Sequence, residues 1–354
     1  MSRRSTAILL GLVLVLMLVA AAVRSPVPFV TLEPGPTLDV LATSEGEPIV
    51  DVDGHETYPT TGALRLVTVS ETTAEHDVLL LEAMNAWWRP SMTLIPREVA
   101  FPEVTTNRDE RAVSAAQMVS SQDTAVAAAL RELDYDLDSF PVVSGITPGG
   151  PAEGELKVRD RVVSVGGTRT PDVDAVFDAV GEVEPGEDVV VEVRRKGAPK
   201  RVTLSTVPHP DDPDRALIGI FPGTGYDFPF DVSVGIDEGI GGPSAGLVFA
   251  LAVYDALTPG ALTGGTDVAG TGTIDDEGKV GPIGGIHQKI MGARRDGATL
   301  FLVPPDNCAA ALSAPVGDDE ITLVRAATLA DAIDAVATHA DDPDAELPRC
   351  TDES

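Results

Sequence analysis

The stretch GGPSAG at residues 241–246 decides how the second half of this chain is interpreted. An apolar run, residues 232–236, precedes it, and a second apolar run begins at Leu247. These flanks predict a strand, a tight glycine turn and a helix, with Pro243 at a first helical position, where its missing N–H costs nothing. Ser244 then lies in the first helical turn. Its hydroxyl either caps the helix or acts as a nucleophile.

The composition predicts a globular, strongly acidic protein. The 354 residues include 43% hydrophobic residues, enough for two or three domains with apolar cores. Asp and Glu number 56 against 25 Lys and Arg, which gives a formal net charge of −31. Such a surface repels phosphate backbones, so nucleic acid is not an expected partner.

The N-terminus predicts membrane targeting. Residues 7–23 are apolar and follow Arg3 and Arg4, so residues 1–24 form either a transmembrane anchor or a signal. Residues 20–22 offer a cleavage site, but we favour an uncleaved anchor. The positive-inside rule keeps the short N-terminus in the cytoplasm. We therefore expect a single-pass protein of the cell membrane with an extracytoplasmic body.

The two cysteines, Cys308 and Cys350, fit that compartment, and we expect them to form a disulfide. No metal is expected, because CxxC and HExxH motifs are absent from the sequence and the histidines are scattered. They are His55, His76, His209, His287 and His339.

The segment at residues 25–125 is predicted as a stalk followed by an α/β segment. Four prolines within residues 26–36 indicate an extended stalk. Alternation over residues 63–69 predicts a strand, and helical spacing predicts a helix over residues 110–133. We hypothesise that residues 37–125 pack onto the body that follows.

Residues 140–206 consist of short β-branched runs between glycine turns, with one helix predicted at residues 172–180. The segment ITPGGPAEGELKVRDRV, residues 146–162, resembles a PDZ domain, with Arg159 where the family usually has glycine. The matching residues are Pro148, Gly149, Pro151, Ala152, Leu156 and Asp160. The resemblance implies a PDZ-like domain over residues 126–208 that binds a peptide as an added strand. Its peptide-binding loop is expected near residues 139–142.

The region after Ser244 predicts two helices. The first carries an apolar stripe from Leu247 to Leu257 and ends before Pro259. The second covers residues 286–296 and turns Lys289 inward, which is unusual for a lysine without a partner or a function.

These motifs together resemble the proteolytic domain of the Lon protease family. They are PSAG around Ser244, the pair Thr271-Gly272, and GKVGPIGGIHQK ending at Lys289. The resemblance covers residues 216–341. It implies a Lon-type domain at residues 209–341, ahead of an acidic tail at residues 342–354.

The resemblance also implies a peptidase with Ser244 as nucleophile, Lys289 as base and Thr271 near the lysine. A buried lysine can lose its proton and serve as a base, and the helix start offers amides to an oxyanion. Gly241 departs from the family, which usually has Asp there. A G-x-x-x-x-G-K-[ST] loop is absent from the sequence, so we expect ATP independence and no cofactor.

The expected fold class is α+β: an N-terminal transmembrane helix, a PDZ-like β module and a Lon-type α/β proteolytic domain. The combination resembles bacterial membrane-anchored PDZ-Lon proteases, and implies membrane or secreted protein substrates and a homo-oligomer, a hexamer by family resemblance. Two alternatives stay open. GPSAG also fits the nucleophile elbow of α/β-hydrolases, with His287 or His339 as base. The chain could also be a membrane-tethered binding scaffold without activity.

Overall fold

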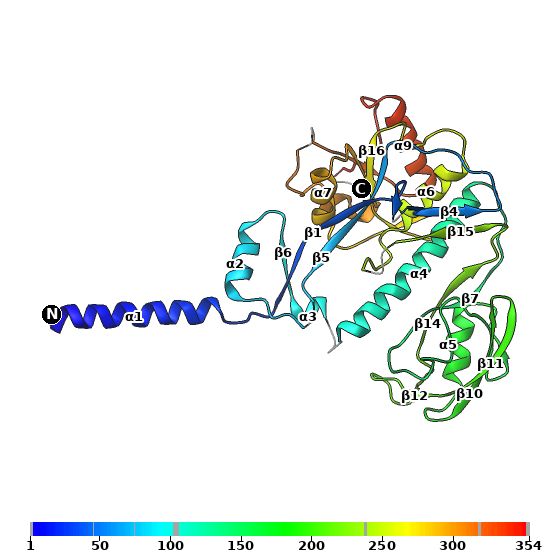
Figure 1. Ribbon diagram of the computed structural model, residues 1–354, viewed down its shortest axis with the longest axis horizontal. Coiled ribbons are helices and arrows are strands. Elements are labelled where there is room, and N and C mark those ends of the chain that lie inside the picture. Colours follow the sequence, from blue (N-terminus) through cyan, green and yellow to red (C-terminus); the bar gives the residue numbers. More distant parts are fainter. Residues whose placement is uncertain are drawn as a thin grey trace.

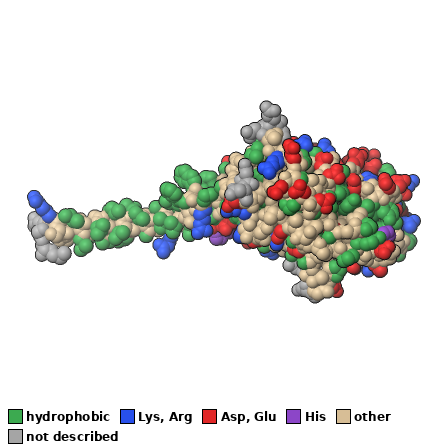
Figure 2. Space-filling model, turned by 90° about the horizontal axis from the view of Figure 1, so that it is seen from above, with side chains coloured by type: hydrophobic (Ala, Val, Ile, Leu, Met, Phe, Trp, Pro, Cys, Tyr) green, Lys and Arg blue, Asp and Glu red, His purple; other side chains and the backbone are tan. Residues whose placement is uncertain are grey.

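The computed structural model describes residues 3–44, 46–73, 75–101, 106–236, 239–317 and 320–351. Its architecture is a mixed α+β body from which one long helix projects (Figure 1). The predicted fold class is therefore confirmed. Acidic side chains are spread over the visible face of the body, while the projecting helix is covered by apolar side chains (Figure 2).

The projecting helix is α1, Arg3–Val23. Its stretch from Arg4 to Val23 is long and apolar enough to cross a membrane, and none of it is buried in the protein. A helix of about 20 residues measures about 30 Å, the thickness of a bilayer's hydrocarbon core. Met1 and Ser2, at the start of the predicted anchor, lie outside the described residues.

The body is built on a six-stranded sheet in the order β20-β19-β16-β5-β1-β6. In chain order these strands are β1 (Phe29–Asp39), β5 (Ala63–Glu71), β6 (Thr93–Pro96), β16 (Asp267–Gly270), β19 (Leu300–Val303) and β20 (Thr322–Arg325). The predicted stalk is wrong from Phe29 onward, because β1 pairs with β5 on one side and with β6 on the other. The register shifts between Pro34 and Thr37, where the prolines are accommodated at a bulge.

Strand alternation divides the sheet's apolar residues between two cores. Leu300 and Leu302 point to the core that holds α6 (Gly246–Leu257) and α9 (Leu329–Asp341). Phe301 and Val303 point to the opposite core, which holds α7 (Ile286–Arg295). The helix that follows Ser244 and the helix that carries Lys289 thus lie on opposite faces of one sheet.

The second sheet has the order β11-β10-β8-β7-β14, with β9 beside β8. Its elements are β7 (Ser139–Ile146), β8 (Arg161–Val165), β9 (Thr168–Arg169), α5 (Val173–Gly181), β10 (Asp188–Arg195), β11 (Ala198–Ser205) and β14 (Ile220–Tyr226). Strand β14 pairs with β7 along its whole length. The edge of β7 that faces β14 is therefore already occupied at residues 139–142, where the peptide-binding loop was expected. The outermost strand on that side is β14.

Helix α4, Asn107–Glu132, connects the two sheets. Its buried residues from Ala125 to Leu130 belong to the core with α6. Its N-terminal half lies on β7 and β14, where a Cβ on Gly145 would come within 2.5 Å of Ala116 Cβ. The predicted boundary at residue 126 thus falls within one continuous helix.

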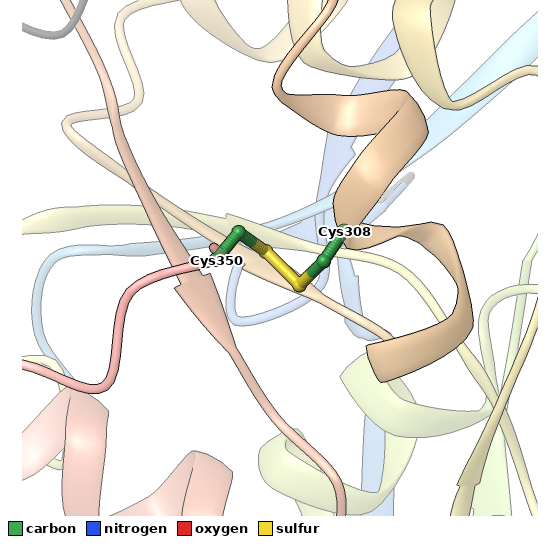
Figure 3. The surroundings of a disulfide bond; sticks show 2 residues. All are labelled: Cys308 and Cys350. Atoms are coloured by element: carbon green, nitrogen blue, oxygen red, sulfur yellow. A yellow bond between two sulfur atoms is a disulfide. The ribbon is translucent and has the colours of Figure 1, made fainter. Parts of the chain in front are cut away.

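Shorter elements complete the chain. They are β2 (Thr43–Ser44), β3 (Glu47–Pro48), β4 (Val50–Asp53), α2 (Leu80–Trp88), α3 (Arg97–Ala100), β12 (Val207–Pro208), β13 (Ala216–Leu217), β15 (Asp231–Val234), β17 (Thr273–Ile274), β18 (Val280–Gly281), a 3₁₀ turn (Pro305–Asn307) and α8 (Cys308–Ala311). The predicted pairing of Cys308 with Cys350 is confirmed: their Cα atoms are 5.1 Å apart and the sulfurs are bonded (Figure 3).

Candidate active site

Ser244 lies in the turn before α6, because the helix begins at Gly246 and not at Pro243 as predicted. The carbonyl of Ser244 accepts hydrogen bonds from the Gly272 N–H, at 2.9 Å, and from the Thr271 hydroxyl, at 3.0 Å. The first helical acceptor is consequently the carbonyl of Ala245, which receives the Phe249 N–H at 3.0 Å. The turn leaves the Ser244 side chain half-exposed at the head of the helix.

Lys289 is brought to Ser244 by α7. Its Nζ donates to Ser244 Oγ at 2.7 Å and to Thr271 Oγ1 at 3.0 Å. The lysine is only 3% exposed, and burial lowers its pKa to about 8. A side chain with that pKa is partly deprotonated just above neutral pH, and this one lies within hydrogen-bond distance of a hydroxyl.

Gly285 allows α7 to begin close to the sheet. It has φ of 69° at the helix N-cap, and a Cβ there would come within 2.7 Å of Val69 Cγ2 on β5. A larger residue would push the start of α7 away from β5. Glycine at this position thus fixes the distance between α7, which carries Lys289, and the sheet.

The turn also presents two backbone donors, the N–H groups of Ser244 and Ala245. In the part of the chain that the structure describes, the N–H groups of Ser244 and Ala245 have no hydrogen-bond acceptor. They lie at the start of α6, where the helix dipole favours negative charge. Together they can stabilise an oxyanion that forms when Ser244 Oγ attacks a carbonyl carbon.

Helix α4 supports the same turn, a contribution that the sequence analysis missed. The carbonyl of Ser114 accepts the Gly242 N–H at 3.0 Å, and Ser121 Oγ donates to the carbonyl of Pro243 at 3.1 Å. A Cβ on Gly241 would come within 2.6 Å of Ser114 Cβ. An Asp at position 241, usual in the family that the sequence resembles, has no room beside α4. No local signal links residues 114 and 121 to residues 241–243, because more than a hundred residues separate them.

Arg159 extends this support to the second sheet. It replaces the motif's usual glycine, has φ of 68°, and donates from Nη1 to Asp123 Oδ1 on α4 at 2.7 Å. Burial raises the pKa of Asp123, and the Arg159 guanidinium opposes that rise. Arg159 thus adopts the left-handed backbone that the usual glycine favours, and its side chain forms an ion pair with α4.

A cavity of about 720 Å³ opens beside the two residues. Its walls include residues 67–71 of β5, residues 239–241 of the turn, and both Ser244 and Lys289. Strand β16 pairs with β5 only over residues 63–66, so among the described strands none pairs with that side of β5 beyond Leu66. An extended peptide can therefore pair with this edge and pass Ser244.

The histidines of the hydrolase alternative are engaged elsewhere. His287 Nε2 lies 2.8 Å from the Ala310 carbonyl and 2.9 Å from Ser313 Oγ. His339 Nε2 lies 3.2 Å from Thr299 Oγ1. Within the described ranges, no group of three or more His, Cys, Asp or Glu side chains could hold a metal ion.

Comparison with known proteins identifies the class that this fold and site define. Residues 230–339 match the family model of the Lon protease (S16) C-terminal proteolytic domain, and residues 116–206 match that of the PDZ domain. The chain thus carries a Lon-type serine peptidase domain and a PDZ domain, as the sequence motifs predicted. The PDZ match begins within α4.

Particular relatives resemble a short part of the chain. Lon protease 1 of Bacillus subtilis is 41% identical over 81 residues, which are 22% of this chain and 10% of that protein. Lon protease 2 of Herpetosiphon aurantiacus is 45% identical over 80 residues, again 22% and 10%. The chain therefore spans about a tenth of the length of these relatives.

A solved PDZ domain of an SdrC-like protein from Listeria monocytogenes also resembles the chain. It is 14% identical, covers 23% of this chain and 86% of that domain, and has a TM-score of 0.22.

Proposed function

We propose that this chain is an ATP-independent, membrane-anchored serine endopeptidase in which Ser244 is the nucleophile and Lys289 the general base. One observation carries the proposal: a lysine that is only 3% exposed donates to a serine hydroxyl at 2.7 Å, and burial lowers its pKa to about 8. A lysine poised near neutral pH beside a hydroxyl is the arrangement that serine activation requires.

The reaction follows from this arrangement in two steps. Neutral Nζ takes the proton of Ser244 Oγ while the oxygen attacks the peptide carbonyl, and the Ser244 and Ala245 amides receive the oxyanion. The protonated lysine then gives that proton to the departing amine, which leaves an acyl ester on Ser244. In the second step neutral Nζ takes a proton from water while the hydroxide attacks the ester carbonyl. The bond to Ser244 Oγ then breaks, the carboxylic acid is released, and the protonated lysine returns its proton to Oγ.

The PDZ domain would recruit protein substrates, because domains of this kind bind peptides along a sheet edge. The outermost strand there is β14, which leads along the chain toward β15 and the turn with Ser244. A peptide held on β14 is thus tethered near the catalytic cleft. We propose membrane or secreted proteins as substrates, since the positive-inside rule applied to Arg3 and Arg4 puts the body outside the cytoplasm.

We further propose that the chain consists, in order, of a membrane anchor, a segment from β1 to β6, the PDZ domain, the proteolytic domain and an acidic tail. The pairing of β5 with β16 supports the packing of residues 37–125 onto the proteolytic body. The net charge of −31 argues against nucleic acid as a partner. By family resemblance the assembly is a homo-oligomer.

Labelling with a fluorophosphonate probe tests the proposal. The full-length protein in mild detergent should carry the probe on Ser244, located by mass spectrometry, without added nucleotide. Ser244→Ala should abolish both labelling and peptide cleavage. Absence of labelling across pH 7–9 in folded protein would leave the inactive scaffold as the better account.

A further inference from the structure

Helix α2, Leu80–Trp88, has its large apolar side chains on the outside. Ala83 and Ala86 face inward and are 7% and 1% exposed. The outward side chains are large: Leu81 is 59% exposed, Met84 44%, Trp87 84% and Trp88 82%. A helix on a soluble surface normally shows the opposite pattern, with apolar residues toward the core. The outer face of α2 therefore lacks the apolar partner that its side chains require.

This face lies at the end of the candidate membrane helix. The Leu80 N–H donates to the Ser25 carbonyl at 2.9 Å, and the Val27 N–H donates to the Val78 carbonyl at 2.8 Å. Pro26 and Leu79 form a bridge between the two segments. Figure 1 shows α2 beside the C-terminal end of α1, between that helix and the body. Because α1 ends at Val23, α2 starts at the level where a spanning helix leaves the hydrocarbon.

The side chains around this face suit a headgroup layer. Arg24 and Arg89, which are exposed, lie at the end of α1 and at the C-cap of α2. Glu82, within the helix, is turned back to the Leu79 N–H and His76. Tryptophan concentrates at membrane–water interfaces, where its ring is buried among lipids and its N–H stays near water.

We propose that α2 lies in the headgroup region of the membrane that α1 crosses, with Leu81, Met84, Trp87 and Trp88 inserted among the lipids. The inference rests on the membrane anchor of the proposed function. Burial of four large apolar side chains drives the contact, so zwitterionic lipids are sufficient. The acidic body, with a net charge of −31, gains nothing from anionic lipids.

The contact would set the position of the catalytic cleft. Strand β6 and helix α3 follow α2 along the chain, and Ile95, Val99 and Ala100 from them line the cavity beside Ser244. With α2 held at the bilayer surface, the cleft opens next to the membrane. The substrates favoured by this geometry are extended segments that leave the membrane close to its surface.

Intrinsic fluorescence tests the proposal directly, because Trp87 and Trp88 are the protein's two tryptophans. The full chain is reconstituted into phosphatidylcholine vesicles with or without bromine on the upper acyl chain. We expect brominated lipid to reduce tryptophan emission by about half or more, and acrylamide to quench weakly. Leu81→Ser with Met84→Ser should diminish the effect of bromine. Leu312→Ser, which removes an apolar side chain that is 40% exposed elsewhere, should leave it unchanged.

Retention of the protein in the vesicles after an alkaline wash distinguishes failure of the α2 proposal from failure of the membrane anchor. Protein that is retained but not quenched by bromolipid overturns the proposal for α2 alone, and weak acrylamide quenching in that case indicates a second copy on this face. Protein that is washed off overturns the anchor and the proposal together.

Rates of peptide cleavage provide a second test of the proposal. Trp87→Ser with Trp88→Ser should lower cleavage of a vesicle-tethered peptide about tenfold and leave the same soluble peptide unaffected. Equal rates for wild type and variant on the tethered peptide would contradict the proposal.

Discussion

Lys289, the proposed general base, also imposes an energetic penalty on folding. Burial lowers its pKa to about 8 in the folded protein, against about 10.4 for an unfolded chain. Below pH 8 both states are protonated, so the folded protein bears the full cost of burying the charge. As the pH rises from 8 toward 10.4 the folded state is already neutral while the unfolded state loses its proton, and the penalty disappears.

Lys289→Met should therefore raise the free energy of unfolding at pH 7 by about 1–3 kcal/mol, with the gain shrinking between pH 8 and pH 10. Urea unfolding at several pH values measures it. Lys279→Met, at an exposed lysine, serves as the matched control and should show no such pH-dependent gain. A destabilised Lys289→Met variant at pH 7 would show that the lysine is part of a favourable buried network.

Thr271 orients both partners of the proposed dyad. Its hydroxyl accepts from Lys289 Nζ and donates to the Ser244 carbonyl. Thr271→Val removes both bonds and should lower kcat about 10–100-fold with KM nearly unchanged, as for other residues that orient catalytic groups. Thr271→Ser keeps the hydroxyl and should retain most of the activity. Steady-state peptidase kinetics distinguish the two variants. A normal kcat for Thr271→Val would show that Thr271 does not orient the dyad.

At the scale of elements, α4 fixes the turn that carries Ser244. Gly241→Ala places a methyl 2.6 Å from Ser114 Cβ and should displace the turn, lowering kcat/KM at least about tenfold. Ser114→Gly removes that obstacle, so the double variant should recover much of the loss. Peptidase assays of the four proteins form the cycle. Equal losses in the single Gly241→Ala variant and the double variant would mean that the contact with α4 is not responsible.

Local patterns predicted most elements but not their pairing. The alternation at residues 63–69 and the helical spacing at residues 286–296 correspond to β5 and α7, because those patterns depend on neighbours in sequence. Strand β1 was missed, since its prolines indicate a stalk until the partners β5 and β6 are known. The predicted start of α6 was too early. The Gly272 N–H, a distant group in the sequence, bonds to the Ser244 carbonyl and keeps Ser244 out of the helix.

The same limit governs the site. The motifs singled out Ser244, Thr271 and Lys289, which the structure brings within hydrogen-bond distance. Ser114, Ser121 and Asp123 carry no motif, and their role depends on where α4 lies. Arg159 departs from a familiar glycine, yet its ion pair with Asp123 could not be inferred from that departure.

At the scale of the whole molecule, the covalent link between Cys308 and Cys350 holds the C-terminal segment to the body. The two residues are 42 positions apart and both are buried. Cys350→Ser should lower the free energy of unfolding by about 2–4 kcal/mol, because the unfolded chain loses a loop constraint. Denaturant unfolding with and without a reductant measures it. The reductant should reproduce the loss in the wild type and change nothing in the variant. Two free thiols in native, unreduced protein would rule the link out.

The whole molecule also explains why domain boundaries are hard to place from sequence. Helix α4 belongs to the core of the proteolytic body through Ala125–Leu130 and to the PDZ sheet through Ala116. Excising residues 126–208 as a unit would therefore remove part of the proteolytic core. Variants on the outer edge of β14 are a sounder way to separate recruitment from chemistry.

The pH dependence of kcat/KM for wild type and Lys289→Arg tests the Ser244–Lys289 dyad most directly. Arginine keeps the positive charge but cannot give up its proton, so it cannot act as a base. The account predicts a wild-type rate that rises with pH and is half-maximal near the lysine pKa of about 8, and a folded Lys289→Arg variant as inactive as Lys289→Ala. Near wild-type turnover by folded Lys289→Arg would contradict it.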